Sequence, residues 1–288
     1  VERLSMQTLF PTLVDAERRH GSVIKGLHFR QRSNRPSQGG RFRSLVGGIG
    51  QLTSAIVATL SASTLQTNSE VTKITGGAPF RIHLASGEAI SVNQVILTTP
   101  AYVTKQLISV LDPTLANICG TIPYTSTATV ALSYPKTSVS HALEGTGFVV
   151  PRVEQGLSLM AASWVSSKWP HRVPSGQILL RGFLGGPRQP DVLEHNDQEL
   201  VSNAHRDLSQ LLGISKKPVI TRVFRWPRLN PQHEVGHLEK VSSIDARLRN
   251  IPGLHIAGAG FRGVGIPDCV SHGRAAGASA SELLKGRD

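Results

Sequence analysis

Four glycines near the end of the chain have spacings that no ordinary loop requires: Gly258, Gly260, Gly263 and Gly265. Because glycine carries no side chain, such a loop lets the backbone approach a bound molecule very closely. The backbone N–H groups at the start of a following helix favour a phosphate or an electron-rich ring edge. A turn that packs tightly between a strand and a helix needs the same glycines, so the pattern leaves a ligand-binding loop and a structural turn as equal alternatives.

Other familiar catalytic signatures are missing. The sequence contains no G-x-S-x-G, H-E-x-x-H or G-x-x-x-x-G-K-[ST] motif. The two cysteines, Cys119 and Cys269, are far apart, and His233 and His237 lie in a segment interrupted by Pro and Gly. We therefore predict no metal site and no catalytic side chain. An enzyme with this sequence would rely on a cofactor for its chemistry.

Composition narrows the class of protein. The 288 residues, of which 39% are hydrophobic, can bury the core of one large domain or two. No apolar run reaches membrane-spanning length, the first residues do not resemble a signal peptide, and two cysteines suit a reducing cytoplasm. The net charge of +12 would attract nucleic acid, anionic lipids or polycarboxylates. Since the basic residues are dispersed and only 5% of residues are aromatic, we do not expect a nucleic-acid partner.

The elements that must position the glycine-rich loop follow from periodicity. Leu254 to Ala257 predicts a buried strand before the loop, and Val270 to Leu284 predicts a helix after it. Earlier in the chain we expect a glycine turn that opens an amphipathic helix up to Leu60, two short strands, and one buried strand over Ile90 to Thr99. Pro100 to Ala116 should be helical. These elements form an α/β unit that resembles the second half of a dinucleotide-binding domain.

Two further regions complete the prediction. The N-terminal segment, Leu4 to Leu27, should be helical and should lead into a basic, mobile surface loop over Arg30 to Arg43. Alternating strands in the middle of the chain, together with a well-capped helix over Asn196 to Leu212, predict an antiparallel sheet with helices inserted between two α/β portions. A last helix is expected around Val241 to Arg249. The fold class is therefore mixed α/β with an inserted domain.

Several segments together resemble one family, the FAD-dependent porphyrinogen oxidases of haem biosynthesis within the flavin amine oxidases. The resemblance runs through nearly the whole chain, and its last two motifs are the most specific. Its segments are FRSLVGGIGQL (Phe42 to Leu52), VILTTPA (Val95 to Ala101), GFVVP (Gly147 to Pro151), SSKWPH (Ser166 to His171), WPRLNPQHEVGHL (Trp226 to Leu238) and HIAGAGFRGVGIPDC (His255 to Cys269). The bacterial enzymes that oxidise coproporphyrinogen III are the most similar in character, and protoporphyrinogen oxidases are related to them.

The resemblance implies an amine-oxidase-like fold and a division of the chain. Residues 1–41 would belong to the substrate or lid region, 42–100 to the middle of the FAD-binding domain, 101–225 to the substrate-binding domain and 226–288 to the end of the FAD-binding domain. The implied reaction is hydride abstraction from the porphyrinogen by FAD, followed by reoxidation of the flavin by O2 to give H2O2. Three such cycles yield the porphyrin.

The resemblance also implies site residues. Those expected to contact the cofactor are Val71, Trp226, Gly258, Gly260, Val264, Gly265 and Ile266. Gly147 and Val149 are expected to border the porphyrinogen pocket. For Trp226 and Val149, ordinary core packing is the alternative. At the level of partners, the resemblance implies a cytoplasmic protein that associates peripherally with the inner face of the membrane and transfers its product to a ferrochelatase.

One departure from the family pattern leaves alternatives open. Family members begin with a strand and a G-x-G-x-x-G motif, and no such motif occurs near Val1. The chain looks like the C-terminal three-fifths of the oxidase, so we expect weak FAD binding and little turnover from the isolated chain. A fragment that binds porphyrin or a partner protein without catalysis is the alternative, and a basic nucleic-acid binder is the third choice. The sequence does not decide between coproporphyrinogen III and protoporphyrinogen IX.

Overall fold

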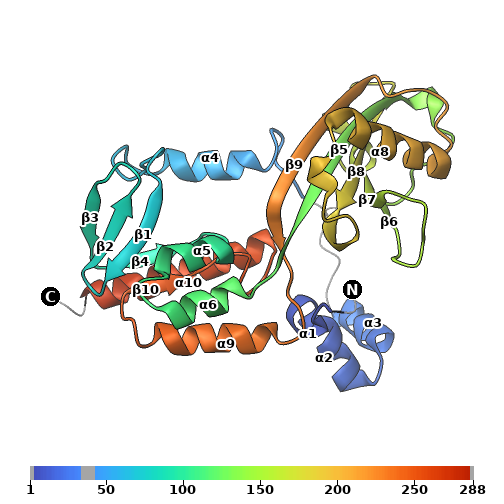
Figure 1. The fold of residues 1–288 in the computed structure, drawn as a ribbon. Helices are drawn as coiled ribbons and strands as arrows, with labels where there is room; N and C mark the ends of the chain where they lie inside the picture. The colour runs from blue at the N-terminus through green and yellow to red at the C-terminus, as the bar shows by residue number, and fades with distance from the viewer. Residues whose placement is uncertain (1–2, 34–42, 286–288) are drawn as a thin grey trace. The chain divides into compact units, whose positions relative to one another are not determined.

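The computed structural model describes residues 3–33 and 43–285, which are divided between two compact units (Figure 1). The first unit combines residues 1–123 with 232–288, and the second comprises residues 124–231. The second unit thus begins at Tyr124, whereas the predicted substrate-binding domain began at residue 101. The difference arises because the two helices between these positions pack on elements of the first unit.

The first unit opens with three helices, α1 (Met6–Leu9), α2 (Pro11–His20) and α3 (Val23–Ser33). The hydroxyl of Ser5 caps α1 by accepting the N–H of Thr8, and Gly21, at φ 64°, ends α2. The predicted loop over Arg30 to Arg43 is wrong at its start, because the backbone stays helical up to Ser33, before the first proline and glycines of that segment. Residues 34–42 of this prediction lie outside the described residues.

Two small sheets organise the rest of this unit. Strands β1 (Val71–Gly76), β2 (Phe80–Leu84) and β3 (Ala89–Val92) form an antiparallel meander, whereas β4 (Val95–Leu97) pairs in parallel with β10 (Leu254–Ile256). The single strand predicted over Ile90 to Thr99 is therefore two strands. The chain leaves one sheet and enters the other at Asn93 and Gln94, which lie between the two.

Helices surround these sheets: α4 (Gly50–Ala58), α5 (Ala101–Ile108), α6 (Pro113–Gly120), α9 (His237–Leu248) and α10 (Ile266–Lys285). The helix predicted over Pro100 to Ala116 is split, because Asp112 caps a new helix by accepting the N–H of Leu115 at 2.9 Å and Pro113 occupies its first turn. The other carboxylate oxygen of Asp112 accepts two hydrogen bonds from Arg247 of α9, at 2.9 and 2.7 Å. This ion pair links the two helices.

The second unit is built on a five-stranded antiparallel sheet with the order β6-β7-β8-β5-β9. Its strands are β5 (Tyr124–Pro135), β6 (Gly147–Val149), β7 (Leu159–Trp164), β8 (Gln177–Gly185) and β9 (Ile220–Pro231). Its helices are α7 (Val165–Lys168), α8 (Asp197–Leu212) and four 3-10 turns, η1 (Lys136–Ser138), η2 (Pro170–Arg172), η3 (Gly186–Arg188) and η4 (Val192–Glu194). The predicted cap of α8 is present, since Asn196 and Glu199 form a reciprocal capping box.

Helix α8 covers one face of this sheet (Figure 1) and creates the main core of the unit. Ala128, Val130, Leu132 and Tyr134 alternate along β5 and pack against Leu200, Ala204, Leu208 and Leu212 of α8. Asp207, also buried, accepts the N–H groups of Ser158 and Leu159 at 2.6 and 2.9 Å and so fixes the start of β7 to the helix. The opposite face of the sheet is where the exposed residues of its strands lie.

Candidate cofactor loop and substrate face

The glycine-rich loop runs from the end of β10 to the start of α10. Gly258 and Gly263 have φ angles of 123° and 159°, in the region that side chains disfavour, so glycine is required there by backbone conformation. Val264 and Ile266 are 53% and 52% exposed, although both are large apolar residues. The loop therefore presents apolar side chains and bare backbone on the surface of the first unit. Such a surface suits a flat, largely apolar ligand.

Two stacked histidines hold this loop from behind. His233 donates Nε2–H to the carbonyl oxygen of Ala259 at 3.1 Å, and His237 donates Nε2–H to that of Phe261 at 2.8 Å. Their rings are buried and stack with 4.0 Å between centroids. Burial, with a contribution from His237, lowers the pKa of His233 to about 4, and burial likewise lowers the pKa of His237. Both rings are therefore neutral near pH 7, with the tautomer fixed by the carbonyl each one contacts.

The start of α10 is chemically different from an open phosphate site. Asp268 lies in its first turn, and its Oδ2 accepts the N–H of Gly265 at 3.2 Å. A carboxylate in this position already complements the helix dipole and would repel a second anion. The loop and helix start thus suit a neutral ring edge better than a phosphate. α10 also begins at Ile266, earlier than predicted, because Pro267 and Asp268 are both favourable in a first helical turn.

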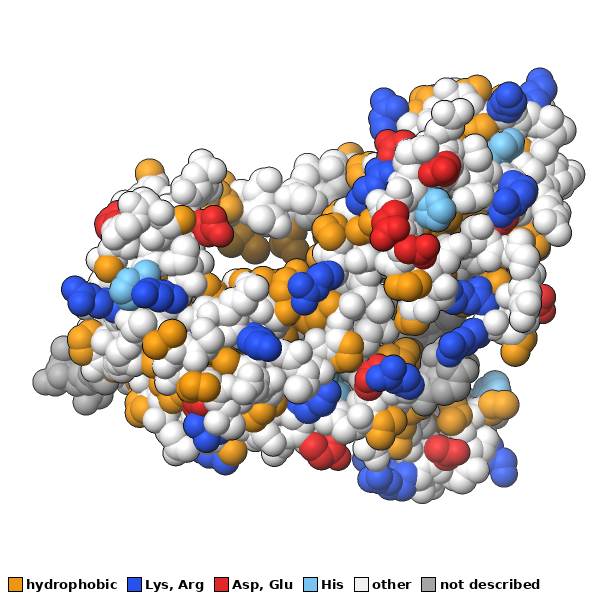
Figure 2. All heavy atoms as spheres, in the orientation of Figure 1, with side chains coloured by type: hydrophobic (Ala, Val, Ile, Leu, Met, Phe, Trp, Pro, Cys, Tyr) orange, Lys and Arg blue, Asp and Glu red, His pale blue; other side chains and the backbone are white. Residues whose placement is uncertain are grey.

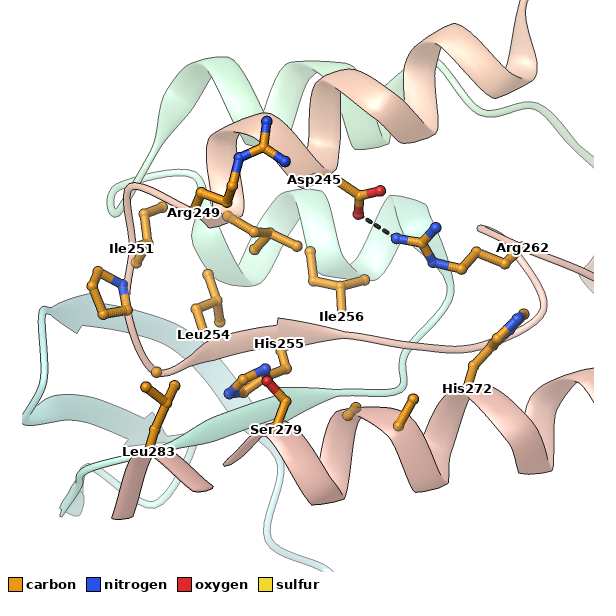
Figure 3. A pocket seen from close by; sticks show the side chains of 15 residues that line it. Asp245, Arg249, Ile251, Leu254, His255, Ile256, Arg262, His272, Ser279 and Leu283 are labelled. Atoms are coloured by element: carbon orange, nitrogen blue, oxygen red, sulfur yellow. Dashed lines mark hydrogen bonds and ion pairs between the residues drawn. The ribbon is translucent and has the colours of Figure 1, made fainter. Parts of the chain in front are cut away.

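A groove of about 660 Å³ lies on the unpaired side of β10, between α9 and α10 (Figure 3). It was not predicted, and none of the predicted cofactor residues lines it. Asp245 and Arg262 form an ion pair at its edge, while His255 hydrogen-bonds Gln94 at 3.0 Å. In the described part of the chain, Nδ1 of His272 is buried and has no partner. Of these residues, only Arg262 belongs to the glycine-rich loop, and its ion pair with Asp245 joins that loop to α9.

The second unit carries three predicted site residues, Gly147, Val149 and Trp226, on one face of its sheet. The register aligns two rows across the strands: Val149, Ala161, Phe183, Thr129 and Phe224 in one row, and Gly147, Ser163, Arg181, Ala131 and Arg222 in the next. Residues directly paired across antiparallel strands share a face. Trp226 pairs with Thr127 on the same face, where its Nε1–H donates to Thr129 at 3.1 Å and its ring stacks on Phe224.

Gly147 and Val149 therefore share a face with Trp226 but lie on the opposite edge strand. A Cβ at Gly147 would come within 2.0 Å of the carbonyl oxygen of Ala162, so the close approach there is to the neighbouring strand. Both residues also line a pocket of about 430 Å³ with Trp164 and two carboxylates, Glu144 and Glu154. An acidic rim disfavours an anionic ligand, whereas the sheet face carries arginines.

The predicted site residues fall into three places. Gly258, Gly260, Val264, Gly265 and Ile266 lie together in the loop and the first residue of α10. Val71 lies in the separate three-stranded sheet, as the half-buried first residue of β1. Trp226, Gly147 and Val149 belong to the second unit. Trp226 and Val149 are 41% and 78% exposed, so neither is the core residue that was the alternative.

The other chemical groups named from the sequence are placed as follows. Burial raises the pKa of the Cys119 thiol to about 12, which makes it an inert, hydrophobic residue. Among residues 3–33 and 43–285, no group of three or more His, Cys, Asp or Glu is arranged to hold a metal ion.

Basic side chains are scattered over the visible surface rather than gathered in one patch (Figure 2). In the described chain, no helix combines the length and apolar character needed to cross a bilayer.

Comparison with known proteins identifies relatives over almost the whole chain. A family model described as flavin containing amine oxidoreductase matches residues 1–279. The coproporphyrinogen III oxidase of Bacillus subtilis (strain 168) is 31% identical over 295 residues, which cover 99% of this chain and 61% of that protein. The chloroplastic protoporphyrinogen oxidase of Nicotiana tabacum is 28% identical, with 93% and 54% covered. The chain thus spans less than two-thirds of the length of these relatives.

Solved structures agree with the sequence comparison. A crystal structure of a candidate protoporphyrinogen oxidase from Exiguobacterium sp. 255-15 matches with a TM-score of 0.81 and 27% identity, and covers 98% of this chain and 60% of that one. A putrescine oxidase redesigned in its cofactor binding matches with a TM-score of 0.61 at 12% identity, covering 84% and 54%, which shows a shared fold alone. The predicted amine-oxidase-like fold and the predicted resemblance are confirmed, and a flavin cofactor fits the matched family.

Proposed function

The chain belongs to the flavin containing amine oxidoreductases, and we propose that it forms part of an FAD-dependent oxidase that converts coproporphyrinogen III to coproporphyrin III in haem biosynthesis. O2 is the proposed electron acceptor and H2O2 the by-product. Coproporphyrinogen III is preferred to protoporphyrinogen IX as substrate because the relatives at 31% identity carry its name and because the net charge of +12 suits a tetracarboxylate.

The observation that carries this proposal is the glycine-rich loop with its exposed apolar residues. Val264 and Ile266 offer an exposed apolar surface for a flat ring, and Gly263 and Gly265 leave room for the side chain of Asp268, which lies 2.8 Å from where their Cβ atoms would be. His233 and His237 keep two carbonyl groups of the loop turned inward. We propose that this segment holds the ring end of FAD, and that Trp226 and Val71 contact the cofactor as the family resemblance implies.

In the proposed reaction, the cofactor and the protein have separate roles. Bound FAD supplies two-electron oxidation, and this chain's residues bind and orient the porphyrinogen and limit the access of water. The exposed sheet face, with Phe183, Phe224 and Trp226, offers flat apolar contacts to a macrocycle. Six hydrogens leave the porphyrinogen in three two-electron steps, and each step reduces one O2 to H2O2. No protein side chain is assigned a catalytic role.

Steady-state turnover tests the proposal. The chain, and any longer product of its gene, is purified with added FAD and mixed in air with coproporphyrinogen III or protoporphyrinogen IX. We expect porphyrin fluorescence to appear together with three equivalents of H2O2, and coproporphyrinogen III to have the larger kcat/KM. Porphyrin that forms at the same rate without protein would contradict the proposal. If this chain and the longer protein both bind porphyrin tightly but neither shows flavin-dependent turnover, a porphyrin-binding module would be favoured instead.

A further inference from the structure

Arg181 is a half-buried cation on the exposed face of the five-stranded sheet, and no acid accompanies it. Within the described chain, its guanidinium donates no hydrogen bond and forms no ion pair. Burial and the nearby Arg172 both lower the pKa of Arg181. Burial and Arg181 in turn lower the pKa of Lys168. Three cations therefore act on one another in a small region of the second unit.

Local structure explains why these cations lie close together. Leu179, Arg181 and Phe183 lie two residues apart along β8, so all three share the face opposite α8. Lys168 ends α7, a short helix that packs beside β8, and Arg172 ends η2, which packs against α7. Arg172 is held over the ring of Trp169, with its guanidinium carbon 5.0 Å from the ring centroid. The cluster is thus fixed by secondary structure.

Such an arrangement is costly for the protein alone. Charged groups that lose part of their hydration are normally paired, and like charges destabilise one another when their field is poorly screened. In the described part of the chain, Arg181 has no acidic partner, and the charged groups that act on it are Lys168 and Arg172, both basic. A bound anion would remove both costs. A guanidinium is well suited to this because its planar N–H groups match the two oxygens of a carboxylate.

The surroundings narrow the kind of anion. Phe183 follows Arg181 on the same face. Two small residues, Ala131 and Ser163, pair with Arg181 on the adjoining strands. Small residues next to an aromatic ring leave a shallow, mainly apolar surface beside the charge. The nearby pocket lined by Glu144 and Glu154 is disfavoured for an anion by its own charge. The ligand that fits is broad, flat and apolar, with a carboxylate at its edge.

We propose that Arg181, with Lys168 and Arg172 beside it, binds a propionate carboxylate of the porphyrinogen on this sheet face. The proposal rests on the proposed function, whose substrate class it makes specific to named residues. The carboxylate is the counter-charge that Arg181 lacks in the described part of the chain, and the macrocycle extends from it over Phe183 toward the aromatic residues of β9. Arg181 is a substrate-binding residue in this account and has no part in the redox step.

Porphyrin titration of the chain tests this assignment. All three tryptophans lie in the second unit, so quenching of tryptophan fluorescence reports binding there. Coproporphyrin III and its tetramethyl ester are titrated into the chain and into three variants. We expect Arg181→Met to weaken binding of the acid about tenfold, corresponding to one charged hydrogen-bonded pair, and to leave the ester unchanged. Arg181→Lys should recover part of the affinity, and Lys216→Gln, a loss of one exposed charge elsewhere in the unit, should change nothing.

Thermal unfolding provides a readout that a structural arginine would not give. Removing an unpaired cation from a cluster of like charge should raise the Tm of ligand-free Arg181→Met, and citrate should raise the Tm of the wild-type chain but not of this variant. A lower Tm with unchanged porphyrin affinity would overturn the assignment and leave the proposed function intact. If citrate protects as expected but neither porphyrin binds, Arg181 binds an anion and the proposed substrate class is wrong.

Discussion

The imidazole rings of His233 and His237 stack with 4.0 Å between their centroids, and each donates one hydrogen bond to the backbone of the glycine-rich loop. His233 lies shortly before α9, and His237 is its first residue. Gly236, which adopts a left-handed conformation, lies between them. Both rings are buried, so protonating either one would place a charge in the interior with no acid among the described residues to compensate it. This contact gives the candidate cofactor loop a defined shape and a defined sensitivity to pH.

The first prediction concerns stability below neutral pH. The pKa of His233 falls from 6.5 when unfolded to about 4 when folded, so the unfolded chain binds more protons in this window. Stability is therefore full above pH 6.5 and is lost as the pH falls toward 4, by roughly 3 kcal/mol. Urea unfolding at several pH values measures this. In His233→Gln the slope between these pH values should be smaller, and an unchanged slope would contradict the account.

The second prediction concerns the loop itself. His237→Leu leaves the buried carbonyl of Phe261 without its donor, which should cost about 1 to 3 kcal/mol and speed amide hydrogen exchange in residues 258–265. His237→Gln keeps an amide N–H near the position of Nε2 and should exchange more slowly than His237→Leu. His255→Gln, outside the loop, serves as the matched control. Equal exchange in His237→Leu and the wild-type chain would show that the histidine does not hold the loop.

The third prediction tests the anchor of β7. Asp207 is fully buried and accepts N–H groups from Ser158 and Leu159, and Arg206 also contacts its carboxylate. Asp207→Ala leaves both donors unpaired, so the free energy of unfolding should fall by about 2 to 4 kcal/mol. Asp207→Asn retains one acceptor oxygen and should lose less. Equal losses in the two variants would contradict a role for these two hydrogen bonds.

The fourth prediction separates steric fit from backbone strain at two glycines. Gly147→Ala would place a Cβ 2.0 Å from a backbone oxygen of β7 and should cost at least about 2 kcal/mol while weakening porphyrin binding. Gly145→Ala shares a positive φ, 82°, but meets nothing within 4 Å, so only strain of about 1 kcal/mol is expected. Denaturant unfolding compares them. Similar losses in both would show that the pairing of β6 with β7 does not require glycine.

Most of the elements follow from the sequence because their signals are local. The cap at Asn196, the alternation along β8 and the apolar strand before Gly258 each depend on a few adjacent residues. One error occurs where a distant partner decides, because the break at Asn93 depends on β10 being available as a partner for β4. Two others come from local signals that were not used: the cap at Asp112 that starts α6, and the turn of Asp268 back to Gly265 at the start of α10.

The candidate site was predictable in part. Glycine spacing indicated the loop, but it does not reveal that two histidines more than 20 positions earlier hold its carbonyls. The sequence raises these histidines only as metal ligands, although a buried imidazole is equally useful as a hydrogen-bond donor. Arg181 could have been found, because period-two alternation over Gln177 to Gly185 puts a charge in line with Leu179 and Phe183. That it lacks an acid nearby depends on packing and needed the structure.

The most direct test of the account is an anaerobic titration of the flavin-loaded protein with coproporphyrinogen III. We predict that the visible absorbance of the bound flavin bleaches as the porphyrinogen is added, with porphyrin fluorescence rising in proportion, and that admitting O2 restores the flavin and releases H2O2. Flavin that stays oxidised under excess porphyrinogen, in a preparation that binds both molecules, would contradict the central claim.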